Sequence, residues 1–167
     1  MSTRILVVAN ETVTGRGLHR TILDRAADAD AVELLVVAPA LNSRLRHWLS
    51  DVDRARRAAE LRLDDCLEIL WTYGLDARGA VGDADPMQAI EDGLRGFAAD
   101  ELVIATHPPG RSHWLEHRLV ERARARFPLP VVHVVVDAVF GREDVVAAWK
   151  GTAPRPRRSR SGGVPAP

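Results

Sequence analysis

The chain has 167 residues, of which 46% are hydrophobic, 28% charged and 5% aromatic, and its 23 basic side chains balance 23 acidic ones. This composition is typical of one globular domain and excludes collagenous, disulfide-rich and wholly disordered chains. The single cysteine, Cys66, cannot form an internal disulfide or a cysteine zinc cluster. No apolar run approaches the roughly 18 residues that span a bilayer and no signal-peptide pattern is present, so the expected compartment is the cytoplasm.

Charge is spread unevenly along the sequence. Residues 150–167 hold five of the basic side chains and no acidic one, which leaves the rest of the chain mildly acidic. We predict a domain over residues 1–137, a short extension over 138–152 and a disordered tail over 153–167, rich in Pro, Arg, Ser and Gly. The tail's charges have no interleaved aromatic residues, so nucleic acid is not an expected partner.

Hydrophobic periodicity predicts an alternation of strands and helices. Short apolar runs rich in β-branched residues predict strands, and these runs cover residues 4–9, 32–38, 75–81, 101–105 and 131–136. Apolar residues at spacings of three and four predict the helices between them, over residues 17–27, 51–73, 86–97 and 112–127. A further short helix is expected over residues 143–150.

This alternation favours a parallel sheet with helices on both faces, because parallel neighbours are joined by right-handed helical crossovers. We therefore expect an α/β fold: a single three-layer α/β/α domain with a five-stranded parallel sheet. Ligands of such sheets bind at the carboxyl ends of the strands, near the point where the strand order reverses. The candidate site loops are those after residues 9, 38, 81 and 105.

Four segments carry a resemblance to a known family. They are Arg4-Ile-Leu-Val-Val-Ala-Asn10, Val81-Gly-Asp-Ala-Asp-Pro86, Ala99-Asp-Glu-Leu-Val-Ile-Ala-Thr106 and Phe127-Pro-Leu-Pro-Val-Val-His-Val134. In this order and spacing they make residues 3–137 resemble a universal stress protein domain. The resemblance implies the strand order 3-2-1-4-5 for the predicted sheet.

The family's phosphate-binding motif is degenerate in this chain. Family members that bind ATP follow the fourth strand with a spaced set of glycines, whose loop and helix amides cradle the phosphates. Laid on this sequence without gaps, the motif positions fall at Ala105, Pro108, Arg118 and Leu119, and none of them matches. Pro108 and Pro109 also remove two backbone donors from this loop. These departures argue against nucleotide binding.

If ATP or another adenine nucleotide is nevertheless the cofactor, the resemblance implies which loops would hold it. The family ends its first strand in aspartate, and Asn10 stands in its place with hydrogen-bonding groups but no charge. The candidate cofactor-binding residues are Asn10, Ala38, Gly82, Thr106, Gly110 and Arg118. The guanidinium of Arg118 could bind phosphate through two parallel charged hydrogen bonds, or Arg118 could be an ordinary solvated helix residue.

Three histidines near the fourth strand raise the alternative of a metal-dependent hydrolase. His113 and His117 are four residues apart on a predicted helix and share a face, which is a spacing that presents two imidazoles to zinc, and His107 precedes them. No fourth ligand can be assigned, so we expect no metal site and no catalytic residue. Gly15-Arg16-Gly17 lacks the third glycine of a dinucleotide fingerprint, which disfavours a nicotinamide or flavin enzyme.

Several other polar residues are expected to be structural. His133 lies between valines of the fifth strand and is interpreted as a core or interface histidine. Cys66 lies within an apolar helix stripe, where a thiol is inert unless exposed. Asp83 and Asp85 precede Pro86, and this pattern predicts a capped start of the third helix rather than an acid–base pair.

The expected function is a non-catalytic stress-response or signalling module that forms a homodimer. In the family the fifth strand is a sheet edge, and an unpaired apolar edge at residues 131–136 is most simply covered by the same strand of a second chain. Two alternatives stay open. One is a nucleotide- or metal-dependent hydrolase that uses the region of His107, His113 and His117. The other is a protein-interaction domain in which Trp48, Trp114 and the basic tail engage an unknown partner.

Overall fold

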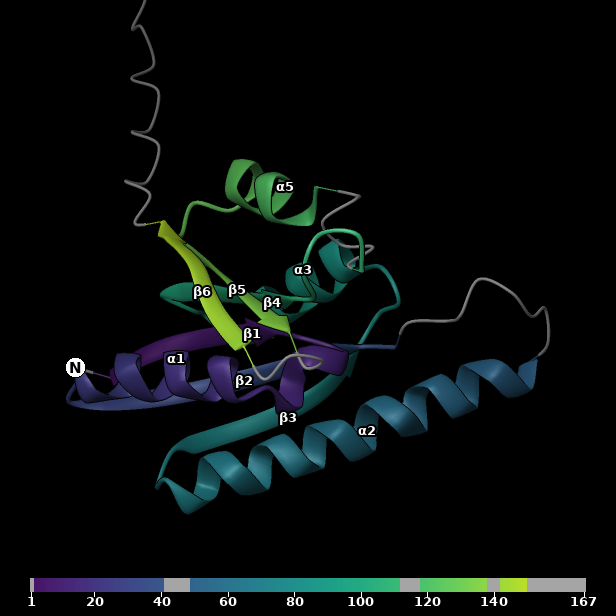
Figure 1. Ribbon diagram of the computed structural model, residues 1–167, viewed down its shortest axis with the longest axis horizontal. Helices are drawn as coiled ribbons and strands as arrows, with labels where there is room; N and C mark the ends of the chain where they lie inside the picture. The colour runs from purple at the N-terminus through teal and green to yellow at the C-terminus, as the bar shows by residue number, and fades with distance from the viewer. Residues whose placement is uncertain (1, 41–48, 112–117, 138–141, 150–167) are drawn as a thin grey trace, which may run out of the picture.

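A central β-sheet with helices on both faces organises the molecule (Figure 1). The computed structural model describes residues 2–40, 49–111, 118–137 and 142–149, and of residues 49–52, 137 and 142–149 it describes the backbone alone. The strands are β1 (Ser2–Val8), β2 (Ala31–Pro39), β3 (Asp76–Gly82), β4 (Glu101–Thr106), β5 (Val131–Asp137) and β6 (Arg142–Trp149). The helices are η1 (Glu11–Thr14), α1 (Arg16–Ala27), α2 (Leu49–Thr72), α3 (Pro86–Gly96) and α5 (Leu119–Arg126).

The strand order in the sheet is β3-β2-β1-β4-β5-β6. Strands β1 to β5 are mutually parallel, and β1 lies at the centre, where Leu6 is in register with Leu35 of β2 and with Leu102 of β4. The continuous apolar run of β1 explains this place, because a strand covered by helices on both faces needs no polar side. The predicted α/β class and the parallel order 3-2-1-4-5 are confirmed.

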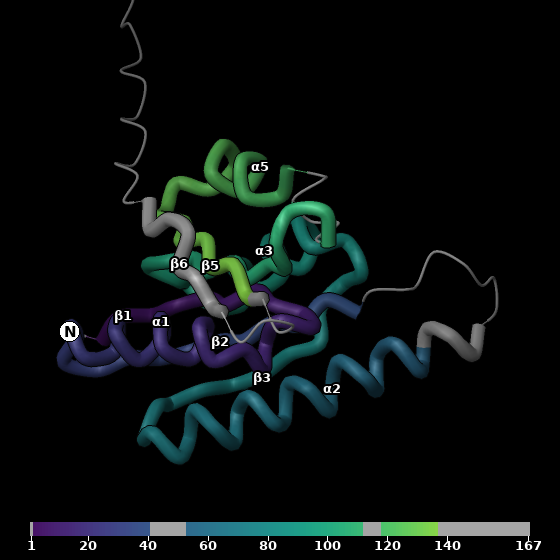
Figure 2. The backbone as a smooth tube through the Cα atoms, in the orientation of Figure 1, coloured from purple at the N-terminus to yellow at the C-terminus, as the bar shows by residue number. Residues whose placement is uncertain are grey.

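Two hydrophobic cores lie on the two faces of the sheet, beneath the helices whose backbone Figure 2 traces. Helices α1 and α2 cover one face, where Leu18, Ile22, Leu63 and Leu70 pack on alternate residues of the strands. Helices α3 and α5 cover the other face, where they bury the strand residues that alternate with those of the first core. This arrangement follows from right-handed crossovers, because connections that move in opposite directions along the sheet place their helices on opposite faces. No described helix is both long and apolar enough to cross a bilayer.

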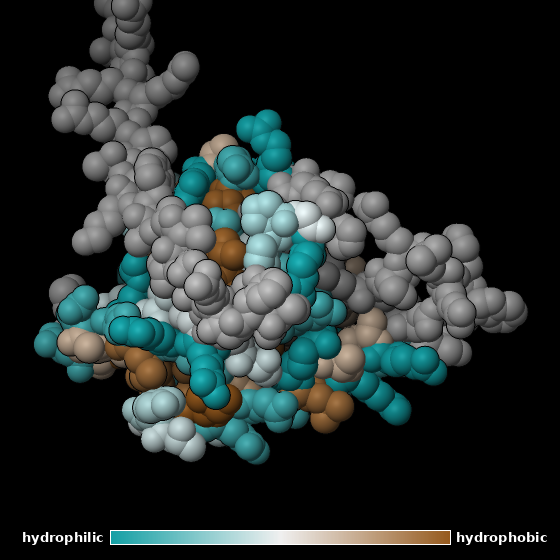
Figure 3. Space-filling model, in the orientation of Figure 1, coloured by the Kyte–Doolittle hydropathy of each residue, from teal (hydrophilic) through white to brown (hydrophobic). Residues whose placement is uncertain are grey.

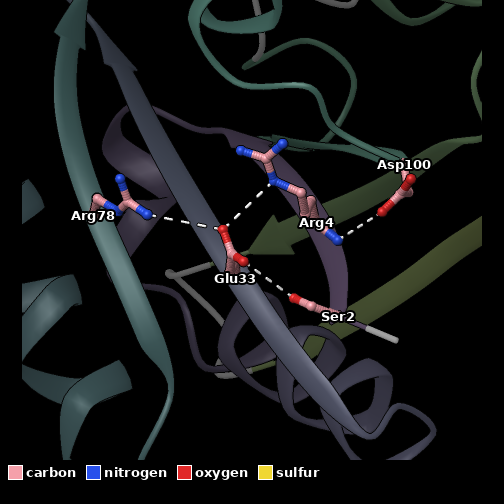
Figure 4. Close-up of polar contacts among 5 residues, drawn as sticks. All are labelled: Ser2, Arg4, Glu33, Arg78 and Asp100. Carbon is pink, nitrogen blue, oxygen red and sulfur yellow. Dashed lines mark hydrogen bonds and ion pairs between the residues drawn. The ribbon is translucent and has the colours of Figure 1, made fainter.

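The amino-terminal ends of the strands are joined by charged groups (Figure 4). Glu33 of β2 accepts a hydrogen bond from Ser2 at 3.3 Å and forms ion pairs with Arg4 at 3.5 Å and Arg78 at 3.8 Å. The backbone amide of Arg4 donates to Asp100, just before β4, at 2.9 Å. These contacts link β1, β2, β3 and β4 at the end of the sheet opposite to the candidate site.

The sixth strand corrects two expectations. Residues 142–149 form β6 rather than the expected helix, and β6 pairs antiparallel with β5, with Val131 opposite Trp149 and Val136 opposite Glu143. The open edge of β5 offers backbone hydrogen bonds that outweigh the weak local preference of this segment. The edge at residues 131–136 is therefore covered from within the chain, so the argument for a dimer through that edge does not hold.

Some expectations fall on residues that the structure does not describe. These are the disordered tail at 153–167 and the first half of the fourth predicted helix, whose described part is α5. His113, His117, Trp48 and Trp114 also lie outside the described residues. The strand β6 lies within the expected extension over 138–152.

Candidate functional site

The strand order reverses between β1 and β4, because β1 continues to β2 on one side and β3 crosses over to β4 on the other. Ligands of open α/β sheets bind in the crevice at the carboxyl ends of such strands. We call this place the switch point and define it by the residues that follow the two strands, 9–14 and 107–111. The predicted site loops after residues 9 and 105 meet here.

Asn10 is held at the switch point by a residue of α2. Nη2 of Arg62 donates to the side-chain oxygen of Asn10 at 2.7 Å, and Asn10 is only 6% exposed. Nε of Arg62 is buried and has no hydrogen-bond partner within the described part of the chain. The contact joins residues 52 positions apart. It occupies the side-chain oxygen of Asn10, which is the group that would otherwise be available to an adenine or a ribose.

The loop after β1 is also tied to the end of β4. The hydroxyl of Thr12 donates to the carbonyl of Ala105 at 3.1 Å, and the carboxylate of Glu11 lies 3.2 Å from Nε2 of His107. The side chain of His107 is mostly buried, at 19% exposed, whereas that of Glu11 is 67% exposed. These contacts connect the loop after β1 to the end of β4 and to His107, and the contact from Arg62 connects the same loop to α2.

A tight turn follows His107 in the loop after β4. The amide of Arg111 donates to the carbonyl of Pro108 at 3.1 Å, and Gly110 has a φ of +83°. Proline at the second position and a positive φ at the third are the features of a type II turn. Gly110, a predicted cofactor-binding residue, is thus required by the turn, while Pro108 and Pro109 have no amide N–H to offer a phosphate.

Arg118 begins α5 in a left-handed conformation. Its φ is 53° and its ψ is 41°, and it is the single non-glycine residue with a positive φ in the described ranges. This position is where the gapless alignment places a glycine of the phosphate motif. The backbone of α5 therefore has the conformation that suits glycine, although the side chain at this position is that of arginine.

The remaining predicted residues end the other strands of the sheet. Thr106, the last residue of β4, is 1% exposed and its hydroxyl lies 2.8 Å from Nε2 of His133. Ala38 in β2 is fully buried. A Cβ at Gly82, the end of β3, would come within 2.7 Å of Val37, so this glycine permits close packing. Asn10 and Thr106 end neighbouring strands, while Ala38 and Gly82 lie at the ends of β2 and β3.

Two residues of the site were missed as site residues by sequence reasoning. Arg62 gave no signal, because its proximity to Asn10 depends on how α2 lies over the sheet. Glu11 lies in the predicted site loop after residue 9, and its place shortly after a strand end is a usable signal. His107 was considered as a metal ligand, and its described partner is Glu11. Within the described ranges, no three His, Cys, Asp or Glu side chains form a possible metal site.

Burial shifts two titratable groups in the core. Desolvation lowers the pKa of His133, the charge of Arg124 lowers it further, and Glu121 acts in the opposite direction. Desolvation also raises the pKa of the Cys66 thiol to about 12, which keeps it protonated at neutral pH. Neither group carries the features of an activated nucleophile or base at the switch point.

A cavity of about 360 Å³ lies away from the switch point, between α3 and the strands β2 and β3. Its lining includes Leu35, Val37, Ala80, Gly82 and Gly93, with charged residues such as Arg78 and Asp92 among them. Of the predicted site residues it includes Gly82 and neither Asn10 nor Thr106. The cavity and the switch-point cluster are therefore two different features.

Comparison with solved structures identifies the class of fold, which is that of the universal stress proteins. No family model and no curated protein matches the sequence. A universal stress protein family protein from Arabidopsis thaliana, solved with AMP bound, is similar with a TM-score of 0.54 and 12% identity, over 85% of this chain and 99% of that one. A universal stress protein family protein from Burkholderia pseudomallei is similar with a TM-score of 0.53 and 20% identity, over 78% of this chain and 94% of that one.

Proposed function

We propose that this protein is a non-catalytic signalling module of the universal stress protein family, and that its own side chains close the switch point against nucleotide. The observation that carries the proposal is the 2.7 Å hydrogen bond from Arg62 to Asn10. A stress-response role in the cytoplasm is part of the same proposal and rests on the resemblance to the family.

The closed switch point has a simple energetic basis. A ligand that used the amide oxygen of Asn10 would first have to displace Arg62, whose charged hydrogen bond is worth about 1.5–3 kcal/mol. The loop after β4 then provides few hydrogen bonds to a phosphate. Pro108 and Pro109 lack amide donors, and Gly110 has the positive φ that the turn requires. Lost contacts without replacement disfavour binding.

A second candidate function is adenine-nucleotide binding. The Arabidopsis protein with the same fold was solved with AMP bound, and Arg62 places a guanidinium at the switch point of this chain. A guanidinium can bind phosphate through two parallel hydrogen bonds. In this alternative Arg62 would exchange Asn10 for a phosphate, so the same residue would assist the ligand instead of excluding it.

The effect of Arg62→Ala on nucleotide binding separates the two candidates. We would titrate AMP and ATP by calorimetry into the wild type, into Arg62→Ala and into the control Arg56→Ala, an exposed residue of the same helix. The closed-site proposal expects no binding by the wild type or by Arg56→Ala. Any binding by the wild type would overturn the closed-site proposal, and a weakening of that binding by at least tenfold in Arg62→Ala would favour the second candidate.

The hydrolase alternative is tested on the same preparations. We expect no metal in native mass spectra of freshly purified protein and no release of phosphate from ATP. Bound zinc would instead favour a site around His107, His113 and His117. The protein-interaction alternative predicts that removal of the basic tail, residues 153–167, abolishes capture of a specific partner.

The proposed module is a homodimer, as expected from the family. Because β6 covers the edge of β5 within the chain, the dimer needs another surface. The long helix α2 offers one on the face that it turns away from the sheet.

A further inference from the structure

The outer face of α2 is exposed along its described length. The helix packs on the sheet through Ala59, Leu63, Cys66, Leu67 and Leu70, which recur at spacings of three and four and are all at most 7% exposed. The opposite face carries Leu61, which is 68% exposed and is the most exposed large hydrophobic residue of the described chain. Figures 1 and 2 place α2 at the border of the molecule, beyond β3.

Charges are divided along this outer face on the two sides of Leu61. Arg54 and Arg57 precede it, and Asp65 and Glu68 follow it, and all four are exposed. The spacings of three, four, four and three residues place them on one face of a helix. None of the four forms an ion pair or a side-chain hydrogen bond within the described part of the chain. In Figure 3 the lower border of the molecule, where α2 lies, carries both hydrophilic and hydrophobic residues.

This pattern is self-complementary under a two-fold axis. Arg57 lies four residues before Leu61 and Asp65 four residues after it, and Arg54 and Glu68 lie seven residues before and after it. If two copies of α2 pack antiparallel with Leu61 against Leu61, each arginine meets a carboxylate of the other copy. The two-fold axis repeats both contacts, which gives four ion pairs around an apolar centre.

We propose that the outer face of α2, defined by Arg54, Arg57, Leu61, Asp65 and Glu68, is the surface through which two copies of this chain form an antiparallel dimer. The proposal rests on the homodimer that is part of the proposed function, and it names the surface. A second copy is the occupant because the charges complement themselves residue by residue. Parallel pairing would instead place Arg54 and Arg57 against the same arginines.

The chemistry of the surface sets the properties of the dimer. Its apolar centre is small and its ion pairs are exposed, so association depends strongly on ionic strength. We expect the dissociation constant of the dimer to be at least tenfold higher at 500 mM than at 50 mM NaCl. Sedimentation equilibrium over a range of protein concentrations measures this difference.

Charge reversal in two halves tests the register. One variant carries Arg54→Glu and Arg57→Glu, and the other carries Asp65→Arg and Glu68→Arg. Each alone places like charges against each other, so each is expected to lose at least tenfold in dimer affinity. An equimolar mixture of the two is expected to form a heterodimer, and a single chain with all four substitutions is expected to dimerise again.

A control variant reproduces the change in net charge of the Arg54→Glu, Arg57→Glu variant without touching α2. Arg20→Glu plus Arg122→Glu replaces two exposed arginines of α1 and α5 and is expected to dimerise like the wild type. Circular dichroism melting of each variant checks that it is folded, and recovery in the mixture is a signal that misfolding cannot produce.

Two results would overturn the α2 surface. One is a wild type that stays monomeric at low salt and high concentration, and the other is a dimer that both half-variants keep unchanged. The second result leaves the homodimer of the proposed function intact and removes only α2 from it. The nucleotide titrations do not depend on the dimer, so their failure and the failure of this surface are distinguishable.

Discussion

The left-handed conformation of Arg118 places strain at the start of α5. A non-glycine residue in this region costs about 1–2 kcal/mol, and glycine avoids the cost at the expense of about 0.5–1 kcal/mol of backbone entropy. We therefore expect Arg118→Gly to raise the free energy of unfolding by about 0.5–1 kcal/mol. Urea denaturation measures the change.

Arg122→Gly is the matched control, because Arg122 lies inside α5. Glycine in a helix interior is expected to lower the free energy of unfolding by about 1 kcal/mol. Equal destabilisation by both substitutions would show that Arg118 has no strain to release in solution.

His133 gives the stability of the protein a pH dependence. Burial and Arg124 lower its pKa from the ordinary value of 6.5, so below pH 6.5 the unfolded chain binds a proton that the folded chain resists. The free energy of unfolding should therefore fall as the pH drops from about 6.5 to 5. The change is measured by urea denaturation at a series of pH values.

The comparison with His133→Gln isolates this contribution from that of the other histidines. Glutamine keeps a polar group for Thr106, which lies 2.8 Å from His133, but it does not titrate. The difference in stability between the wild type and His133→Gln should shrink or reverse as the pH falls. Parallel curves would exclude His133 as the source.

The switch point shows which residue contacts can be predicted from a sequence. That the loops after β1 and β4 meet at one edge of the sheet follows from the strand pattern, because parallel strands end at the same edge. The contact from Arg62 to Asn10 was not found, because it depends on where one turn of α2 comes to lie relative to β1. Periodicity fixes which face of α2 is buried, but it does not fix its position along the sheet.

At the scale of elements, local signals were reliable where packing agreed with them. The start of α3 is an example, because Asp85 was predicted as a capping residue before Pro86 and its carboxylate accepts the amide of Met87 at 2.8 Å. Residues 143–150 are the opposite case. A helix is predicted there, but residues 143–149 belong to the strand β6. The edge of β5 with which they pair lies outside the segment, so local propensity does not reflect it.

Removal of the cap measures its contribution to α3. Asp85→Ala leaves the amide of Met87 without this acceptor, so we expect the free energy of unfolding to fall by about 1 kcal/mol. Asp24→Ala in the exposed interior of α1 is the control and should be neutral or stabilising by a few tenths of a kcal/mol. Chemical denaturation compares the two, and an equal effect would argue against capping.

At the scale of the whole molecule, β6 determines which surfaces are available for association. It pairs with β5 over residues 131–137 and thereby ends the sheet on that side. An uncovered strand edge attracts other strands, whereas the outer face of α2 offers side chains only. The chain thus replaces the expected strand-to-strand contact by an internal one.

A chain that ends at residue 141 tests this role of β6. Without β6 the backbone groups of β5 along one edge lose their partners, and Val132, Val134 and Val136 lie on a strand that is free to pair. We expect this chain to unfold at a lower temperature and to associate through β5, with little dependence on salt because backbone hydrogen bonds are not screened like ion pairs. Combining the truncation with Arg54→Glu and Arg57→Glu removes the α2 surface, so association that persists in sedimentation velocity belongs to β5. A truncated chain with these substitutions that stays monomeric would contradict the role given to β6.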